Sequence, residues 1–561
     1  MRSDGLIVRA GTSAIDPGNA LRVARRCVRE SLPGEWIVKP MGAESRDFTV
    51  RRKRSSVNPT VAQAFEMART LRRHRDVEDC EPSLLMPVDG PREMQLRTGR
   101  RAGITARRLS GLDSSSSGGG SHLSCSAAAD WAHSLCSIRK AWDLVPPAGG
   151  KSKGKGIVIG HPDTGYTDHP EITDPGRLLT LRGYDFEDED RDARDPLTGR
   201  SAGHGTSTGS VIMSSDSTAA GVIGVAPQAS LIPLRVTGNV VILSFGKLAS
   251  AIRYAVDSGV HVISISLGGP VSSRFLDRAV HYAVERGVIV VCAAGNVWPF
   301  VVYPARLDEA IAVAACNCQG QVWADSASGS AVDITAPGES VWRAESKSGS
   351  FVVSQSSGTS YATAIVAGAA ALWLAYHGRD RLVSKYGVQN LASVFREQLI
   401  LHGYDRPLRW DTEQFGVGIL NAEKLLKGRL PGSAMASGLR ALRSVAAPTR
   451  RSSVDQIADL FPEATPVAIR KGLSKFLGVS DIRLNREIED VADEIAYHAA
   501  TNMRFRELIL AGKLSASVAA GTAGSSRALA SRRTSRRTSA PKAPKPPAVS
   551  KQLKAMTGTL K

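Results

Sequence analysis

Residues 358–376 read Gly-Thr-Ser-Tyr-Ala-Thr-Ala-Ile-Val-Ala-Gly-Ala-Ala-Ala-Leu-Trp-Leu-Ala-Tyr. A glycine, a threonine and a serine precede a long apolar run rich in alanine, which predicts a buried helix. A serine at a helix start has its hydroxyl beside unpaired backbone N–H groups and the positive end of the helix dipole, where negative charge is stabilised. On this stretch alone, an equally good interpretation is that Thr359 or Ser360 simply caps a core helix.

The chain has 561 residues, enough for two or three domains, and 42% of them are hydrophobic, as in ordinary globular proteins. Its formal net charge of +19 is concentrated at the two ends. Residues 513–561 contain 11 Lys and Arg and no acid, and residues 1–128 contain 22 Lys and Arg against 14 Asp and Glu. Basic ends are usually solvated, and the alternative is binding to nucleic acid or another acidic partner.

Seven cysteines, an odd number in a long chain, do not indicate a disulfide framework. Cys316 and Cys318 are too close to bridge each other and are expected to be core or surface thiols. The N-terminus lacks the apolar run of a secretory signal, and the longest apolar run, 362–376, is shorter than the roughly 20 residues that span a bilayer. We therefore expect a cytoplasmic protein with no membrane partner, although secretion by another route stays open.

Residues 1–90 alternate between strand-like and helix-like periods. The strand-like segments are 6–10, 36–38, 48–50 and 77–86, and helical spacing occupies 19–32 and 58–71. The order β-α-β-β-α-β predicts a small ferredoxin-like domain. Residues 91–128 are rich in Arg, Ser and Gly, a composition that predicts a flexible linker open to cleavage.

From residue 129 to 428, short apolar runs alternate with helical segments. The strand-like runs are 156–159, 231–234, 260–265 and 288–291, and the helical segments between the later ones are 247–258 and 274–286. Continuous apolar strands separated by helices predict an α/β domain with a parallel sheet covered by helices on both faces. Beyond it, composition and spacing predict a linker at 429–453, a small helical domain at 454–512 and a disordered basic tail at 513–561.

Three more motifs lie in the α/β region, and each has a structural alternative. Asp163 ends an apolar strand and begins Asp-Thr-Gly, which is also a common turn. His204 stands between glycines at a predicted helix start, where it could be a cap. Asn296 follows a strand and a glycine, which is ordinarily a turn position.

Together the motifs form a working chemical set with Ser360. A serine hydroxyl is a weak nucleophile that needs a base; a histidine supplies it, and a buried aspartate orients the imidazole. A side-chain amide and a backbone N–H can receive an oxyanion. Because catalytic groups gather at the carboxyl edge of a parallel sheet, we expect Asp163, His204, Asn296 and Ser360 to converge there.

The order Asp163-Thr164-Gly165, His204-Gly205-Thr206 and Gly358-Thr359-Ser360 resembles the subtilisin (subtilase) family of serine peptidases, over roughly residues 129–428. The resemblance implies that Ser360 is the nucleophile, His204 the general base and then acid, and Asp163 its orienting partner. It also implies an oxyanion hole formed by the Asn296 amide and the Ser360 N–H. Ser266, Leu267 and Gly268 would hold the substrate as an added β-strand.

Residues 1–90 resemble the propeptide of that family, an intramolecular chaperone and inhibitor whose end is cut by the enzyme itself. We therefore expect a zymogen with its cleavage region in 91–128; the alternative is a permanently attached domain. The chain departs from the family's usual proline and histidine at Ala364 and Ile365, one turn beyond the nucleophile. Val302 stands where a glycine often leaves room for the substrate, which predicts a narrow pocket and a preference for small or medium side chains.

The sequence thus predicts a serine endopeptidase that cleaves peptides and proteins through an acyl-enzyme and requires no cofactor. The acidic run 185–192 is a candidate structural calcium site, although acidic loops are usually only solvated. One rival is a binding protein that uses the basic tail and the helical domain, with the peptidase fold as scaffold. Another is esterase chemistry from the same residues.

Overall fold

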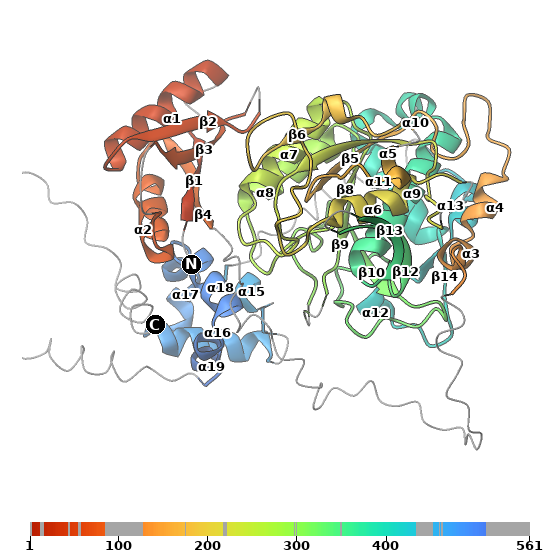
Figure 1. Cartoon of the computed structure of the whole chain (residues 1–561). Helices are drawn as coiled ribbons and strands as arrows, with labels where there is room; N and C mark the ends of the chain where they lie inside the picture. The colour runs from red at the N-terminus through yellow and green to blue at the C-terminus, as the bar shows by residue number, and fades with distance from the viewer. Residues whose placement is uncertain are drawn as a thin grey trace, which may run out of the picture.

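The computed structural model describes residues 3–11, 16–42, 45–53, 58–84, 127–173, 176–216, 221–296, 298, 300–347, 350–432, 453–458, 460–461 and 464–511. The predicted linker 91–128 and tail 513–561 lie almost wholly outside these residues. Figure 1 shows a large α/β body, a smaller N-terminal α/β part beside it, and a helical part that lies next to both.

The N-terminal part is a four-stranded antiparallel sheet with two helices, in the predicted order β-α-β-β-α-β. Its elements are β1 (Ser3–Ala10), α1 (Pro17–Ser31), β2 (Trp36–Pro40), β3 (Asp47–Arg52), α2 (Val61–Arg72) and β4 (Val77–Leu84). The strand order is β2-β3-β1-β4, so β1 is central, with Val8 opposite Phe48 on one side and Cys80 on the other. A capping box of Thr60 and Gln63 begins α2. The predicted ferredoxin-like pattern is confirmed.

The large body is built on a nine-stranded sheet in the order β14-β15-β11-β10-β9-β8-β5-β7-β6, parallel throughout except for the edge pair β14–β15. Its strands are β5 (Val158–Asp163), β6 (Tyr184–Asp185), β7 (Ser230–Arg235), β8 (Val262–Ile265), β9 (Ile289–Ala293), β10 (Ile311–Cys316), β11 (Ile334–Pro337), β14 (Tyr404–Asp405) and β15 (Ile419–Leu420). Every residue of β8, β9, β10 and β11 is buried. Such burial is typical of parallel strands covered on both faces.

Helices cover both faces of this sheet. The helical elements of the body are α3 (Trp131–Leu135), α4 (Ile138–Trp142), α5 (Pro170–Thr173), η1 (Thr180–Arg182), α6 (His204–Met213), α7 (Gly246–Asp257), α8 (Arg274–Glu285), α9 (Thr359–His377), α10 (Arg379–Tyr386), η2 (Val388–Asn390), α11 (Leu391–Leu401), α12 (Thr412–Phe415) and α13 (Ala422–Lys427). In β5, Gly160 faces Ala255 of α7, whereas the next residue, His161, contacts Thr208 of α6. Neighbouring residues of a strand point to opposite faces, so α7 and α6 lie on opposite sides.

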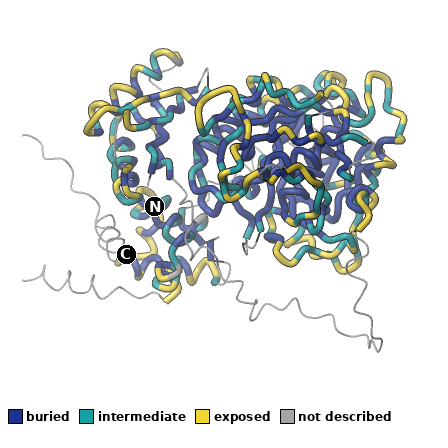
Figure 2. The backbone as a smooth tube through the Cα atoms, in the orientation of Figure 1, coloured by how far each residue is buried: buried dark blue, intermediate teal, exposed yellow. Residues whose placement is uncertain are grey.

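The apolar stretch that contains Ser360 forms α9, which is buried along almost its whole length (Figure 2). Among the described residues it is the only helix long and apolar enough to span a membrane, and 94% of that span is buried inside the protein. Its small side chains bring it close to neighbouring elements: a Cβ on Gly368 would lie 2.6 Å from the Cβ of Val225. The predicted core helix is therefore confirmed.

Some elements carry no clear signal in the sequence. A two-stranded antiparallel hairpin, β12 (Val341–Lys347) and β13 (Ser350–Ser356), precedes α9 and packs on α6.

The cysteines at 316 and 318 differ in state. Cys316 is a free, buried thiol as expected, but Cys318 is disulfide-bonded, so the expectation of a thiol was wrong for Cys318. Cysteine spacing along the chain excluded a bridge between these two residues and carried no information about a distant partner.

The helical module comprises α15 (Ser453–Ala458), α16 (Pro466–Leu477), α17 (Asp481–Ile488), α18 (Ala492–Thr501) and α19 (Met503–Ala511). Its helix ends follow local rules: Thr465 caps α16, Pro466 opens it, and Gly478 ends it in a left-handed conformation. The module has its own apolar core, in which Phe461, Phe476 and Phe505 are fully buried.

We predict that Gly368→Ala destabilises the protein although alanine is the better helix former. The added methyl would collide with Val225, and overpacking of this kind costs about 1–3 kcal/mol. When Gly368→Ala is introduced into the Ser360→Ala protein, the midpoint of thermal unfolding should be lower than that of Ser360→Ala alone. The control is Gly18→Ala in α1, where the glycine is exposed and only the Asp16 side chain is near; a midpoint equal in both variants would contradict the packing argument.

Candidate active site

Three of the predicted site residues lie at one edge of the large sheet. Asp163 is the last residue of β5, Ser266 directly follows β8, and Asn296 follows β9 by three residues. The three strands are neighbours and parallel, so their carboxyl ends lie at the same edge. The helices α6 and α9, which begin at His204 and Thr359, pack against each other. The expected convergence of the four motifs follows from this topology.

Asp163 and His204 form a direct hydrogen bond. Nδ1 of His204 lies 2.7 Å from Oδ1 of Asp163, and the same oxygen accepts the Thr164 N–H at 2.7 Å. Asp163 is fully buried, whereas the His204 side chain is 15% exposed. Burial alone raises the pKa of the Asp163 carboxyl, but the neighbouring His204 outweighs it and holds the pKa below its usual value. Asp163 is therefore an anion that accepts the Nδ1 proton and leaves Nε2 unprotonated in the neutral ring.

A second histidine, His161, lies against the same carboxylate. Its Nε2 is 3.0 Å from the Thr208 hydroxyl and 3.8 Å from Oδ2 of Asp163, and its ring is only 2% exposed. Burial lowers the pKa of His161, so the ring is neutral at pH 7. The motif around Asp163 did not by itself point to His161. Its position two residues before Asp163, on the same face of the strand, was the available signal.

Ser360 is the second residue of α9, and its hydroxyl points toward the segment after β8. Its Oγ donates to the Ser266 carbonyl at 3.3 Å, and the Ser266 hydroxyl donates back to the Ser360 carbonyl at 3.2 Å. The N-cap of α9 is Gly358, with no side-chain cap. The alternative in which Thr359 or Ser360 merely caps the helix is therefore wrong.

Asn296 is held in one orientation by the residue before Ser360. Its Oδ1 accepts the Thr359 N–H at 2.9 Å and the Thr359 hydroxyl at 2.8 Å. A backbone N–H can only donate, which assigns the amide oxygen to this side. The amide nitrogen is therefore directed away from Thr359 and lies beside Gly358. Thr359, which the sequence suggested only as a cap, is the residue that orients this amide.

The segment predicted to bind substrate already has a backbone partner. The Gly268 N–H donates to the Val240 carbonyl and its carbonyl accepts the Ile242 N–H, both at 2.9 Å. Leu267 is buried. For an added substrate strand to bond to Gly268, the 240–242 segment would have to give up these bonds. The role of Ser266, Leu267 and Gly268 stays a prediction.

Most carboxylates of the acidic run 185–192 pair with basic side chains. Arg235 pairs with Asp185 and Asp188, and Lys247 with Glu187. Glu189 pairs with Lys39 and Arg51 of the N-terminal part. Because side-chain cations of the protein pair with most of these carboxylates, little of their charge is left for a metal ion, and the calcium site stays a prediction.

The structure thus forms pairs among the predicted residues: Asp163 with His204, Ser360 with Ser266, and Asn296 with Thr359. Among the hydrogen bonds of the described residues there is none between the His204 ring and the Ser360 hydroxyl. Such bonds are often formed only when substrate is present. A hydroxyl, an imidazole held by a carboxylate, and a fixed amide at one sheet edge have the chemistry of acyl transfer.

Comparison with known proteins agrees with this chemistry. The subtilase family pattern matches residues 154–392. Thermitase from Thermoactinomyces vulgaris is 36% identical over 255 residues, which cover 45% of this chain and 84% of thermitase. Subtilisin Savinase from Lederbergia lenta is 36% identical over 220 residues, which cover 39% of this chain and 76% of Savinase.

Among solved structures, that of MycP1 with its N-terminal propeptide removed aligns with 54% of this chain and 98% of its own chain, at 25% identity and a TM-score of 0.42. A score of that size adds nothing to the sequence relationship. The sequence relationship extends over most of the length of thermitase and is sufficient by itself to assign the family. The chain belongs to the subtilase family and is a subtilisin-like serine endopeptidase.

Proposed function

We propose that this endopeptidase acts through Ser360 as nucleophile, His204 as general base and Asp163 as the residue that orients His204. The observation that carries the proposal is the 2.7 Å bond from His204 Nδ1 to the buried Asp163 carboxylate, at the sheet edge where Ser360 lies in the first turn of α9. A carboxylate in that place fixes the tautomer that accepts a proton at Nε2 and stabilises the imidazolium once formed.

In the first step, the Ser360 hydroxyl turns from the Ser266 carbonyl to His204, gives its proton to Nε2 and attacks the peptide carbonyl carbon. The bond to the leaving amine then breaks as His204 returns the proton to it, which leaves an acyl group on Ser360. Water, deprotonated by the same histidine, hydrolyses this ester. Among the described residues, the hydrogen bond that this rotation of the Ser360 hydroxyl breaks is the one to the Ser266 carbonyl, at 3.3 Å.

The negative oxygen formed in each attack would be received by the amide nitrogen of Asn296 and the backbone N–H of Ser360. Two bonds from Thr359 hold this amide in place before the reaction. A donor that is already oriented does not have to reorganise as charge develops, which is the main source of such stabilisation. The start of α9 adds the positive end of its dipole.

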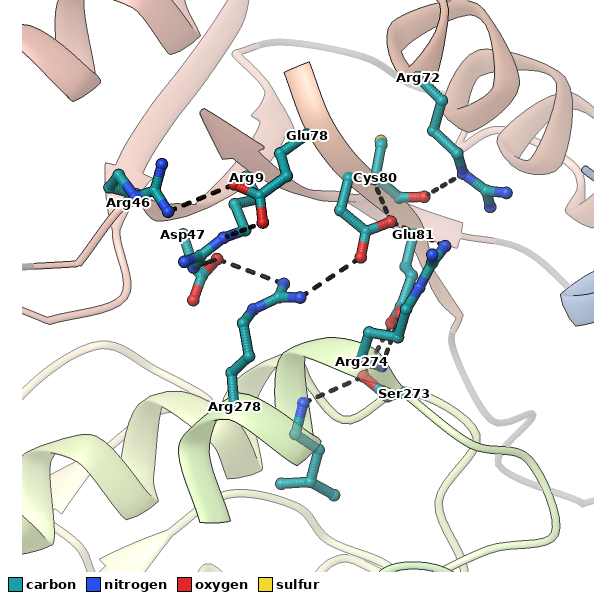
Figure 3. Close-up of polar contacts among 12 residues, drawn as sticks. Arg9, Arg46, Asp47, Arg72, Glu78, Cys80, Glu81, Ser273, Arg274 and Arg278 are labelled. Atoms are coloured by element: carbon teal, nitrogen blue, oxygen red, sulfur yellow. Dashed lines mark hydrogen bonds and ion pairs between the residues drawn. The ribbon is translucent and has the colours of Figure 1, made fainter. Parts of the chain in front are cut away.

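We also propose that the N-terminal domain holds the enzyme as a zymogen. Its sheet packs on α7 and α8 of the catalytic body through buried acids, and Figure 3 shows the contacts to α8. Asp47 pairs with Arg253 at 3.1 Å and with Arg278 at 3.4 Å. Asp79 pairs with Arg274 at 2.9 Å and Arg278 at 3.5 Å. Ion pairs of this kind give a defined orientation between two surfaces.

Glu81 at the end of this interface covers the start of α8. It accepts the Ser273 hydroxyl at 2.8 Å and the Arg274 N–H at 2.9 Å, so it satisfies a free donor of the helix. Burial, reinforced by the nearby acids Asp79 and Asp493, raises the pKa of Glu81 to about 8. Four residues later, at position 85, the chain leaves the described part and continues into the predicted cleavage region.

The rival function, a binding protein with an inert peptidase fold, is not favoured by the relationship to active proteases. The basic tail that would bind nucleic acid or another acidic partner lies outside the described residues. Binding there stays a prediction that is independent of the peptidase activity.

We predict that a serine-directed fluorophosphonate labels the protein and that Ser360→Ala abolishes both labelling and peptide hydrolysis, because the nucleophile is lost. Ser357→Ala, an exposed serine three residues earlier, is the control and should keep both. On a denaturing gel the wild type should show cleavage within 91–128 and Ser360→Ala should stay intact. Labelling of Ser360→Ala would contradict the assignment, and equal sizes on the gel would contradict self-cleavage.

Asn296→Ala should lower kcat by about 100- to 1000-fold with little change in KM, which is the loss seen when one oxyanion donor is removed from a subtilisin. Steady-state kinetics on a peptide substrate measures it. Gln319→Ala removes an exposed amide elsewhere in the same body and should leave kcat unchanged. A rise in KM alone would assign Asn296 to substrate binding instead.

Val302→Gly should shift the preferred residue before the scissile bond from a small or medium side chain to an aromatic one. The methyl groups of Val302 lie against the positions where Gly268 and Gly295 would carry a Cβ, so they narrow the space behind the substrate segment. We expect the ratio of kcat/KM for Phe over Ala peptides to rise at least about tenfold. The buried neighbour Val301 offers the control, because Val301→Gly should cost stability without moving this ratio.

A further inference from the structure

The helical module lies against the N-terminal domain as well as the catalytic body (Figure 1). Of its helices, α18 faces α2 of the N-terminal domain. The two contacting segments are more than 400 positions apart in the chain, and the catalytic body lies between them in sequence. Nothing in the proposed inhibition by the N-terminal domain requires a third part at this place.

A buried ion pair joins the two helices. Arg69 of α2 donates to Glu494 of α18 at 2.5 Å, and the two side chains are only 6% and 4% exposed. One turn further along α2, Arg72 pairs with Asp493 at 3.0 Å. Both members of the first pair are out of water, and Arg69 also pairs with Glu66 at 3.0 Å. Reversing the charge of either member would therefore place like charges together in a buried site.

Apolar contacts surround this ion pair. The ring of Phe65 in α2 packs against Tyr497 in α18, with centroids 6.0 Å apart. A cavity beside the rings is lined from all three parts, by Leu84 of β4, Phe245 before α7 and Ala496 of α18. Both rings belong to the same continuous apolar cluster as the catalytic core. The junction is therefore closed by apolar packing as well as by charge.

The module also contacts the loop that follows Asn296. Phe300 packs against the apolar core of the module, although it lies only four residues beyond the proposed oxyanion donor. The same helical module thus contacts both the N-terminal domain and the loop beside the active site.

We infer that the helical module is a second docking surface for the N-terminal domain, which keeps that domain bound to the catalytic body after the 91–128 connection is cut. The inference rests on the proposed function, in which the bound N-terminal domain inhibits the enzyme. The module remains covalently joined to the catalytic body, so the two surfaces act on the N-terminal domain as a bivalent receptor. Linking two surfaces in this way can strengthen retention by about 10²–10⁴ over either alone.

The consequence is that cleavage of the connection does not by itself activate the enzyme. Release also requires loss of the Arg69–Glu494 contact, by displacement or removal of the module. The partner that this surface fits is therefore one face of α2 in the N-terminal domain. Phe65, Arg69 and Arg72 lie on successive turns of that face.

The test uses full-length Ser360→Ala protein with a site-specific protease sequence placed within residues 97–120. After cleavage there, the labelled N-terminal domain should co-elute with the rest of the protein in size-exclusion chromatography, and its dissociation rate is measured on dilution. Arg69→Glu and Glu494→Arg should each raise this rate at least about tenfold, because each leaves like charges facing each other in a buried site. The double charge swap should restore a slower rate.

Two controls guard against unfolding and general charge effects. Arg73→Glu and Asp490→Arg change exposed residues next to the contact on each side and should leave the rate unchanged. Circular dichroism of each variant reports folding, and slower release in the double swap than in both single variants excludes simple loss of structure. Single variants that release the domain at the parental rate would overturn the inference.

A separate arm tests inhibition itself. The same cleavage site is introduced into protein that keeps Ser360, and the peptidase activity is measured after the connection is cut. High activity with the N-terminal domain still bound would refute the zymogen proposal and leave the docking surface standing. Low activity that rises in Arg69→Glu, in parallel with the release measured above, supports both.

Discussion

The structure depends on the burial of one helix, α9, against the centre of a parallel sheet. Alanine and glycine fill the positions of α9 that neighbouring elements approach most closely, and a Cβ added to Gly368 would already be too close to Val225. Protein interiors are close-packed, so a helix surrounded on all sides cannot slide along its axis. The position of its first turn is therefore fixed. That turn carries Ser360 to the sheet edge where Asp163 and Asn296 also lie.

Around this core, the interactions differ in kind. The catalytic body is built on one large apolar cluster, whereas the contacts between parts of the chain add several ion pairs to apolar packing. Asp47, Asp79 and Glu81 contact the helices of the body, and Arg69 contacts Glu494 of the helical module. Charged interfaces can separate into water with less loss than apolar cores, since their groups are readily hydrated. Ion pairs at these contacts fit the proposal that the N-terminal domain is released from a catalytic body that stays folded.

The structure also shows where the residues that depart from the family pattern lie. Ala364 and Ile365 are both fully buried in α9, where they continue its tight packing. His161 adds a neutral, buried imidazole near Oδ2 of Asp163, the oxygen that His204 does not contact, and the Thr208 hydroxyl links the two. The carboxylate is thus surrounded by polar groups of fixed direction, which favours its charged form.

The sequence by itself determined the secondary structure of the N-terminal domain, the main strands of the large sheet and the buried helix, and it named Asp163, His204, Asn296 and Ser360 as candidate site residues. These are recorded locally, in hydrophobic period, turn residues and short motifs. Only the tertiary structure decided which distant groups meet: Thr359 on Asn296, His161 behind Asp163, Val240 and Ile242 on Gly268, a disulfide at Cys318, and Arg69 on Glu494. The physical reason is that such contacts depend on how separate elements pack, and the spacing of residues along one segment carries no measure of the distance to another.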